Sequence, residues 1–295
     1  MGSSFFATFL LLSVAGAAIG LAIRLLLPRV LAWRGVWFTW RTRFGAAMVF
    51  DSADADGTTV RLLNVNGTFQ SVCYVDDDLL WDPVCEYHRS WAHVVHAAWP
   101  LRAANHATET GQVPRPPRRA LVMGGGGYSF PKWLVAYRPD FACATVEIDP
   151  RITAIAQERL FLDKLVADFD TKRTGRLKLV CADAWDYLLS REEKFDLIVN
   201  DAFGGNRPLG KMDTREGAAQ IRRHLHEDGV YIGNVRTPLV GRRAEVLNRT
   251  KEAFAHEFQH VWILPERPED PRRPGNNALV ACNRALDLGT IGTMQ

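Results

Sequence analysis

The chain has 295 residues, 47% of them hydrophobic, and a formal net charge of +3 at pH 7. This length is enough for one sizeable core, a small accessory domain and an anchor. The small charge, with no aromatic and basic binding motif outside the amino-terminal region, gives no case for nucleic-acid binding. Five cysteines without a C-x-x-C pair indicate small buried residues in a reducing compartment rather than a disulfide framework.

The first predicted element is a transmembrane helix over residues 5–27. This stretch is apolar apart from Arg24, and a helix of about 23 residues can cross a bilayer. A cleaved signal peptide is the main alternative. It is disfavoured because no Lys or Arg precedes the apolar run and because the run continues past the small residues 15–18. A buried helix of a soluble protein is a third interpretation.

Arginines lie near the end of the predicted span and after it, and none precedes it in the sequence. They are Arg24, Arg29, Arg34, Arg41 and Arg43. The positive-inside rule therefore places the carboxyl-terminal part of a single-pass membrane protein in the cytoplasm. Trp33, Trp37 and Trp40 recur at three to four residue spacing, which predicts an interfacial helix at the lipid headgroups. A structural helix packed on the folded domain would show the same spacing.

Four parts of the chain are expected: the anchor with its arginine-rich segment at 1–43, a small β-rich domain at 44–108, a linker at 109–118, and a large domain at 119–295. Turn signals at 54–57 and at Asn66-Gly67 predict hairpins in the small domain, and a helix is expected over 83–99. The linker is rich in proline and basic residues.

Four consecutive glycines at 124–127 end an apolar run, and Glu147 ends the next one. Such a run predicts a buried strand that turns sharply where side chains would block a ligand's approach to the backbone. At this spacing a carboxylate can accept hydrogen bonds from both ribose hydroxyls of an adenosine held against the glycine turn. The alternative is a tight turn without a ligand.

A dinucleotide fits this turn less well than an adenosyl sulfonium. The dinucleotide fingerprint needs a third glycine at position 129 or 130, where the chain has Ser129 and Phe130. S-adenosylmethionine or its decarboxylated form is therefore the better candidate.

The large domain alternates apolar runs with helical stretches, which predicts a doubly wound, mostly parallel sheet with its ligand at the strand carboxyl ends. The expected strands cover 121–123, 144–148, 177–181, 197–200, 230–235, 261–264 and 278–282. The expected helices cover 129–138, 150–162, 184–190, 214–226 and 242–258. The acids at the strand ends are Glu147, Asp149, Asp183 and Asp201.

An H-E-x-x-H match, from His256 to His260, raises the question of a zinc hydrolase. Such a site needs a third ligand and a helix that faces an open cleft. We expect this helix to pack on the back of the last strands, so we treat the match as a chance occurrence and expect no metal.

The sequence resembles the spermidine synthases (polyamine aminopropyltransferases) from about residue 60 to residue 283. The matching stretches are 66–71, 86–89, the glycine run, 146–150, 181–184, 195–196 with 200–203, and 276–280. The resemblance implies a class I methyltransferase fold, with a Rossmann-like seven-stranded sheet after a small amino-terminal β domain. In this chain a transmembrane helix would precede both.

The resemblance also implies roles for individual residues. Asp201 matches the acid that helps to deprotonate the attacking amine, with Tyr87 as its helper. Glu147 matches the ribose ligand and Asp183 the ligand of the adenine amino group. The implied cofactor contacts are Gln70, His88, Gly124, Gly125, Gly126, Glu147, Asp183 and Ala184. An alkylammonium must lose a proton before its nitrogen attacks the carbon next to sulfur, so a carboxylate or phenol is needed to accept that proton.

Three positions depart from the family pattern. Gly127 stands where an acid normally favours the decarboxylated cofactor, and Gly204 stands where the active-site loop normally has its second acid. Arg89 adds positive charge beside the expected amine site, which would be unfavourable if it faced the pocket. Compensation could come from Asp76, Asp77, Asp78 or Glu86, although these acids also fit a solvated turn.

We therefore expect a membrane-anchored transferase that moves an aminopropyl group from decarboxylated S-adenosylmethionine to a polyamine or related amine. Two alternatives stay open: an S-adenosylmethionine-dependent methyltransferase, which the glycine at 127 favours, and a degenerate nucleoside-binding scaffold, which would follow if Asp201 were directed away from the pocket. The expected partners are a small-molecule amine and the membrane, without nucleic acid. The acceptor amine and the formation of a homodimer are left open.

Overall fold

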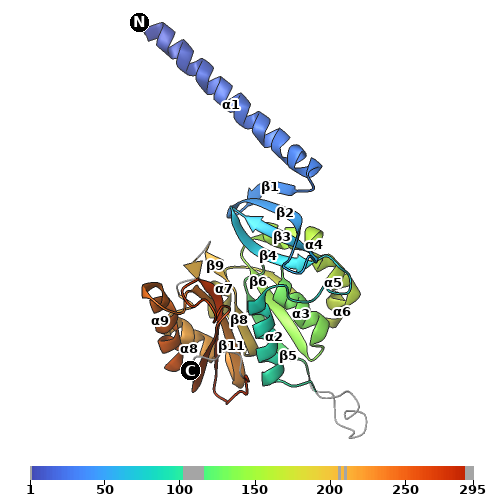
Figure 1. The fold of residues 1–295 in the computed structure, drawn as a ribbon, viewed down its shortest axis with the longest axis vertical. Coiled ribbons are helices and arrows are strands. Elements are labelled where there is room, and N and C mark those ends of the chain that lie inside the picture. Colours follow the sequence, from blue (N-terminus) through green and yellow to red (C-terminus); the bar gives the residue numbers. More distant parts are fainter. Residues whose placement is uncertain (1, 102–115, 205–206, 209–210, 290–295) are drawn as a thin grey trace.

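The computed structural model describes residues 2–101, 116–204, 207–208 and 211–289, with side chains from residue 13 onward except at 204 and 207–208. A long helix leads into a small sheet, which lies against one end of a larger sheet covered by helices (Figure 1). The predicted linker at 109–118 lies largely outside the described residues.

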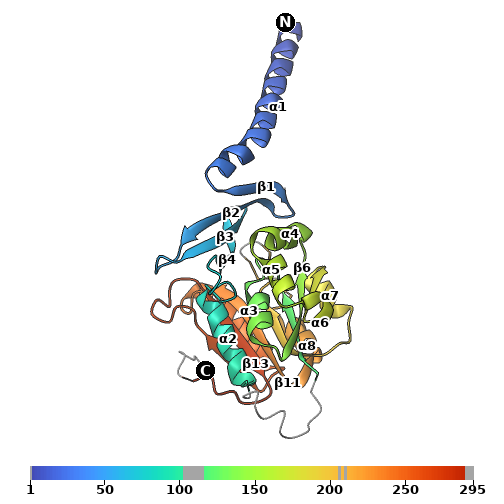
Figure 2. The ribbon, with the colours of Figure 1, turned by 90° about the vertical axis from the view of Figure 1, so that its right-hand side faces the viewer.

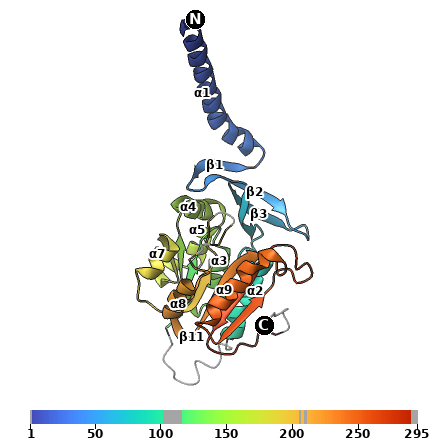
Figure 3. The same ribbon diagram turned by 90° about the vertical axis from the view of Figure 1, so that its left-hand side faces the viewer.

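The first element, α1 (Gly2–Trp33), contains a segment long and apolar enough to cross a membrane. This segment, Ser13–Trp33, has a mean hydropathy of 1.8 and none of it is buried. The helix points away from the rest of the chain in all three views (Figures 1, 2 and 3). The described part of α1 is therefore not packed into the core of this chain.

The chain after α1 forms strand β1 (Trp37–Thr42), so the interfacial helix predicted through Trp37 and Trp40 was wrong. This segment consists of aromatic residues, threonines and one arginine, and aromatic and β-branched side chains favour a pleated strand. β1 pairs in antiparallel fashion with β2 (Gly45–Ala53), and the rings of Phe38 and Trp40 meet edge to face at 4.6 Å.

The small sheet has the strand order β1-β2-β3-β4, and all its pairs are antiparallel. β3 (Thr59–Val65) and β4 (Thr68–Tyr74) are joined by the predicted Asn66-Gly67 turn. Both turn residues have positive φ, 50° and 79°, which is the geometry of a two-residue type I′ hairpin. This hairpin sets the register that brings β4 over the larger sheet.

The larger sheet contains the seven strands that the apolar runs predict, in the order β12-β13-β11-β8-β5-β6-β7. Their bounds are β5 (Arg118–Met123), β6 (Phe141–Glu147), β7 (Leu177–Cys181), β8 (Phe195–Asn200), β11 (Leu225–Thr237), β12 (His260–Leu264) and β13 (Gly275–Cys282). The five strands from β11 to β7 are parallel, and β13 runs antiparallel to both of its neighbours. The mostly parallel α/β fold is therefore confirmed.

Helices cover both faces of this sheet, and the split follows from the two-residue period of the strands. In β5, for example, Ala120 and Val122 pack toward α2 and α3, whereas Leu121 and Met123 pack toward α7, α8 and α9. Figure 1 shows α2 and α3 on one side of the sheet and α8 and α9 on the other. The bounds are α2 (Glu86–Ala98), α3 (Ser129–Tyr137), α7 (Ala184–Leu189), α8 (Arg215–Arg223) and α9 (Glu245–Ala255).

The small sheet packs on α4 (Pro150–Arg159) and α5 (Leu162–Asp168) through a third apolar cluster. Short remaining elements are α6 (Thr171–Thr174), β9 (Phe203–Gly204) with β10 (Arg207–Pro208), and the 3-10 turn η2 (Arg242–Ala244). One polar link adds to this packing. The backbone N–H of Arg43, in the β1–β2 turn, donates to the buried carboxylate of Asp149 at 2.6 Å.

Candidate active site

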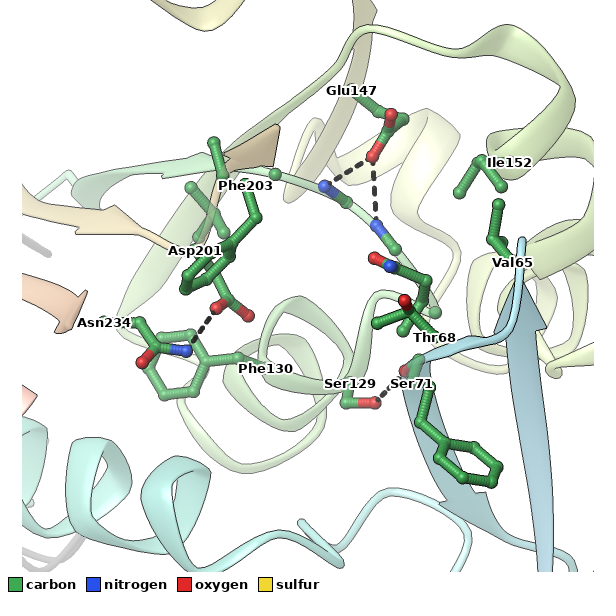
Figure 4. A pocket seen from close by; sticks show the side chains of 18 of the residues that line it. Val65, Thr68, Ser71, Ser129, Phe130, Glu147, Ile152, Asp201, Phe203 and Asn234 are labelled. Atoms are coloured by element: carbon green, nitrogen blue, oxygen red, sulfur yellow. Dashed lines mark hydrogen bonds between the residues drawn. The ribbon is translucent and has the colours of Figure 1, made fainter. Parts of the chain in front are cut away.

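A cavity of about 810 Å³ lies between β4, the first turn of α2 and the carboxyl ends of the parallel strands. All ten residues predicted for the site line it. They are Gln70, Tyr87, His88, Gly124, Gly125, Gly126, Glu147, Asp183, Ala184 and Asp201. Glu147 and Asp201 lie on opposite sides of the space between β4 and the glycine turn (Figure 4). The cavity therefore has a Glu147 end and an Asp201 end.

The glycine turn brings two loops close together at the floor of the cavity. Gly124 has φ +97°, and a Cβ atom there would lie 2.6 Å from the carbonyl oxygen of Asp201. A side chain at this position would therefore push the loop after β8 away. At Gly126 a Cβ atom would lie 3.6 Å from the carbonyl oxygen of Gln70, because β4 crosses above the turn.

Glu147 is buried and its carboxylate is tied to the backbone around it. Oε2 accepts hydrogen bonds from the N–H groups of Gly125 and Gly126 at 2.9 and 3.0 Å (Figure 4), and Oε1 accepts one from the N–H of Asp149 at 2.9 Å. A carboxylate has about four acceptor positions, so three of them are used. A ribose hydroxyl could use the remaining one, and a second hydroxyl would have to share an oxygen with a backbone donor.

Asp183 is the N-cap of α7, and only one of its oxygens serves this purpose. Oδ1 accepts hydrogen bonds from the N–H groups of Trp185 and Asp186 at 2.9 and 3.2 Å. Oδ2 accepts none from any residue that the structure describes. Because the N-cap interaction fixes the carboxylate at the cavity wall, the free oxygen can accept a hydrogen bond from a ligand.

Asp201 follows β8 and is directed into the cavity, with 22% of its side chain exposed. Its Oδ1 accepts a hydrogen bond from Asn234 Nδ2 at 2.9 Å (Figure 4), and its Oδ2 lies 3.5 Å from His88 Nε2. Burial, followed by the nearby charges of Asp201 and Glu266, keeps the pKa of Tyr87 well above its usual value. At neutral pH, Tyr87 is therefore a neutral phenol beside an acid.

Buried polar atoms at the Asp201 end lack partners among the described residues. They include His88 Nδ1, Trp91 Nε1 and Asn234 Oδ1. All three side chains line the cavity, and buried polar groups are nearly always hydrogen-bonded in folded proteins. This end of the cavity can therefore accept a polar ligand. Sequence reasoning missed Asn234; its only signal was an amide within an otherwise apolar strand.

The structure explains why an acid is missing at Gly127. A Cβ atom there would lie 2.7 Å from Ser71 Cβ and 3.1 Å from Leu160 Cδ1, so Ser71 fills the space that a side chain would need. The Ser129 hydroxyl donates to the carbonyl of Val72 at 3.0 Å, so in the 3.1 Å contact between the two serines Ser71 is the donor. Ser71 Oγ can thus offer only lone pairs to the cavity.

Arg89 does not bring its charge into the cavity. Its guanidinium donates to the carbonyl of Pro83, to Glu86 and to the hydroxyl of Tyr74, and it is not part of the cavity lining. The acids that could have compensated the charge of Arg89 also lie outside the cavity lining. Asp76, Asp77 and Asp78 form an exposed turn, and Glu86 pairs with Arg89.

The H-E-x-x-H match does not lie on one helix. α9 ends at Ala255 and β12 begins at His260, so His256 and His260 do not have helical i, i+4 geometry. Among the described residues, no three His, Cys, Asp or Glu side chains are grouped to hold a metal ion.

Comparison with known proteins gives a consistent result. The model of the spermine/spermidine synthase domain matches residues 85–268. A polyamine aminopropyltransferase of Moorella thermoacetica is 26% identical over 154 residues, 52% of this chain and 53% of that protein. One from Ruegeria sp. is 26% identical over 232 residues, 77% and 74% of the two chains. The chain thus spans about half the length of the Moorella relative.

Solved structures agree on the fold. The crystal structure of a probable spermidine synthase from Corynebacterium glutamicum matches with a TM-score of 0.63 at 21% identity, covering 83% of this chain and 79% of that chain. At this identity the match supports the architecture of the two sheets and says nothing of individual residues.

Proposed function

We propose that this chain, which belongs to the spermine/spermidine synthase family, transfers an aminopropyl group from decarboxylated S-adenosylmethionine to an amine. One observation carries the proposal. The Asp201 carboxylate is held at the end of β8, facing into a cavity whose other end is formed by the glycine turn and Glu147. An acid opposite a nucleoside site is the arrangement that this transfer requires.

In the proposed reaction, the neutral amine nitrogen attacks the carbon next to the sulfonium sulfur. The new C–N bond forms as the C–S bond breaks, and sulfur keeps the electron pair, so methylthioadenosine leaves as a neutral thioether. The proton that nitrogen must lose passes to Asp201 and then to water. The sulfonium is already a good leaving group, so orientation of the two reactants supplies much of the rate enhancement.

At the nucleoside end, we assign the ribose to Glu147 and the adenine amino group to the free Oδ2 of Asp183. The glycine turn lets the sulfonium approach the backbone, and Ala184 and Gln70 complete the walls. These roles are supported by the positions of the residues around one cavity and by the acceptor capacity that remains on each carboxylate.

At the amine end, Asp201 is the proton acceptor and Tyr87 positions it. The raised pKa of Tyr87 argues against the phenol as base, because it stays protonated at neutral pH. We assign the Tyr87 hydroxyl to positioning the acid, whose charge contributes to its raised pKa. The His88 ring lies 4.0 Å from the Tyr87 ring, with its Nε2 3.5 Å from Asp201 and its Nδ1 buried without a partner among the described residues.

A direct test uses the full chain in detergent with decarboxylated S-adenosylmethionine, S-adenosylmethionine and methylthioadenosine. Calorimetry should show tighter binding of the decarboxylated form, lost in Glu147→Ala and kept in a control on exposed α9, Glu252→Ala. Incubation with amines should release methylthioadenosine. Absence of release with every amine tested, despite nucleoside binding, would contradict the transfer. Failure to bind any of the three nucleosides would contradict the assignment of this cavity as a nucleoside site.

Methyl transfer from S-adenosylmethionine is the second candidate, and the environment of Gly127 favours it. Ser71 replaces a carboxylate there, so selection for the decarboxylated cofactor through an ion pair at that point is lost. Tighter binding of S-adenosylmethionine than of its decarboxylated form, together with methylation of an acceptor, would establish methyl transfer as the function. A scaffold without chemistry is less well supported, because Asp201 is directed into the cavity.

We also propose that α1 spans a membrane once, with the rest of the chain in the cytoplasm. The exposed apolar segment and the arginines that follow it support this topology. The expected results are resistance to alkaline carbonate extraction and protection of a carboxyl-terminal reporter from protease added outside intact cells. A mature protein that has lost its first 20 or so residues would instead indicate a signal peptide.

A further inference from the structure

The charges that line the cavity are unevenly distributed between its two ends. Glu147 and Asp183 lie at the nucleoside end, where they are bonded to backbone amides. Among the described lining residues, Asp201 is the one carboxylate at the other end. This is little negative charge for an acceptor with two ammonium groups, since desolvated charges require partners.

A cation lies on the same strand as Asn234, the residue that donates to Asp201, and it also lines the cavity. Arg236 is two residues after Asn234 on β11, so both side chains project from the same face of the sheet, and both line the cavity. The guanidinium of Arg236 makes no ion pair or hydrogen bond with any other residue in the described part of the chain. Its guanidinium is exposed and available to a ligand.

Glu266, in the connection between β12 and β13, is engaged by other residues. Arg236 lies opposite Asn276 in the β11–β13 register, and Asn276 donates to both carboxylate oxygens of Glu266, at 2.8 Å from its backbone and 3.2 Å from its amide. Arg267 lies 3.8 Å from the same carboxylate. Glu266 is not part of the cavity lining, although its charge reaches the Asp201 end, where it helps to keep the pKa of Tyr87 raised. Its carboxylate is already shared by Asn276 and Arg267, so it is a weaker partner for a second ammonium than a lining acid would be.

A free arginine on the wall selects for an anion. Guanidinium groups bind carboxylates through paired, charge-assisted hydrogen bonds, and they repel ammonium groups at the same distance. An acceptor whose reacting amine lies at Asp201 would therefore place its far end toward a positive charge. A diamine would meet an unfavourable contact there, and an amine that carries a carboxylate would meet a favourable one.

We propose that Arg236 forms a carboxylate subsite beyond Asp201 and Asn234, and that the acceptor is an ω-amino carboxylate rather than a diamine. This inference rests on the proposed transfer at the same site. It makes Arg236 a binding residue that determines acceptor specificity and leaves Asp201 as the proton acceptor.

The test compares two ligands of equal carbon number, 4-aminobutanoate and 1,4-diaminobutane, on the full chain saturated with methylthioadenosine. Calorimetry should show about tenfold or tighter binding of the amino carboxylate, as expected for a charge-assisted hydrogen bond. Arg236→Glu should reverse the preference and Arg236→Gln should abolish it. The control Arg249→Glu, an exposed arginine of α9 outside the cavity lining, should change nothing.

Three results would overturn the proposal. One is binding of the diamine more tightly than the amino carboxylate, especially if Glu266→Gln weakens it and Arg236→Glu does not. Another is the binding of neither ligand. The third is a loss in Arg236→Glu of affinity for S-adenosylmethionine and not for its decarboxylated form, which would assign the carboxylate to the cofactor.

Turnover separates this inference from the proposed function. If the amino carboxylate binds as expected and methylthioadenosine is never released, the proposed transfer is contradicted and the proposed Arg236 subsite is supported. If methylthioadenosine is released with the diamine, and the Arg236→Glu variant keeps the wild-type kcat/KM for the amino carboxylate, the proposed subsite is contradicted and the proposed transfer is supported.

Discussion

Asn234 donates a hydrogen bond to Asp201 at 2.9 Å, across the carboxyl ends of two adjacent parallel strands. The bond fixes one oxygen of the carboxylate, so that the other is directed at His88 and the cavity. Asn234 Oδ1 is buried and has no partner among the described residues. The acceptor that this pair offers to the N–H groups of an ammonium is therefore the free oxygen of Asp201.

Asp201→Asn should lower kcat by about 10²- to 10⁴-fold, the usual contribution of a general base. The amide keeps the size of the carboxylate and cannot accept the proton, so binding of methylthioadenosine should change little. Methylthioadenosine release and calorimetry measure the two effects separately. Asp186→Asn, an exposed acid of α7, is the control. A small change in kcat would show that the proton leaves by another route.

Gly124→Ala should be more damaging than Gly57→Ala, although both glycines have positive φ, +97° and +83°. At Gly57 no atom lies within 4 Å of the added Cβ, so only backbone strain of about 1–2 kcal/mol is expected. At Gly124 the added Cβ meets the Asp201 carbonyl at 2.6 Å and must also displace the active-site loop. Thermal unfolding and kcat should both be lower for Gly124→Ala; equal effects would mean that the loop yields freely.

Gly127→Asp alone should destabilise the protein by about 1–3 kcal/mol, because the new side chain overlaps Ser71. The double substitution Gly127→Asp with Ser71→Gly should recover much of that loss. It should also raise the binding preference for decarboxylated over carboxylated S-adenosylmethionine, because an acid then faces the free amine. Unfolding midpoints and the ratio of the two dissociation constants measure these effects. An unchanged ratio in the double variant would show that the cofactor tail lies elsewhere.

Asp213 should make stability depend on pH in the acid range. Burial raises its pKa to about 6, above the usual value of an aspartate side chain. The folded state therefore holds this proton more tightly than the unfolded state, so the contribution is complete below about pH 4 and is lost as pH rises to 6. Asp213→Asn should remove this slope and raise the unfolding temperature at pH 7. The same slope in wild type and variant would contradict the assignment, and Asp186→Asn serves as the control.

Much of the large sheet was predictable, because its central parallel strands, such as β5 and β8, are mostly apolar runs that are followed directly by the glycine turn or by an acid. β7 begins and ends where the sequence places it, at Leu177 and Cys181. β1 was not predictable from spacing alone. Trp33, Trp37 and Trp40 fit a helical face, and the strand is set by pairing with β2, which the segment itself does not reveal.

The site residues were found through glycines and acids at strand ends, where chemistry and position coincide. The residues that were missed act through tertiary contact. Asn234 matters because of the β8–β11 register, and Ser71 matters because β4 crosses the glycine turn. In the sequence nothing distinguishes Arg236 from the other arginines. The structure does, because it places Arg236 in the cavity wall beside Asn234. Spacing along the chain carries no information about such neighbours.

The connection between α1 and β1 limits where catalysis could take place. Trp33 ends the helix and Trp37 begins the strand, so the chain between them can extend no more than about 14 Å. With α1 in a bilayer, the body would be held at a nearly constant height above the lipid surface. The β1–β2 turn, whose Arg43 is bonded to Asp149 two residues after Glu147, would then couple the tilt of the membrane helix to the nucleoside end of the cavity. The substrates would have to be drawn from the thin water layer at the membrane, whose ionic composition differs from that of the bulk cytoplasm.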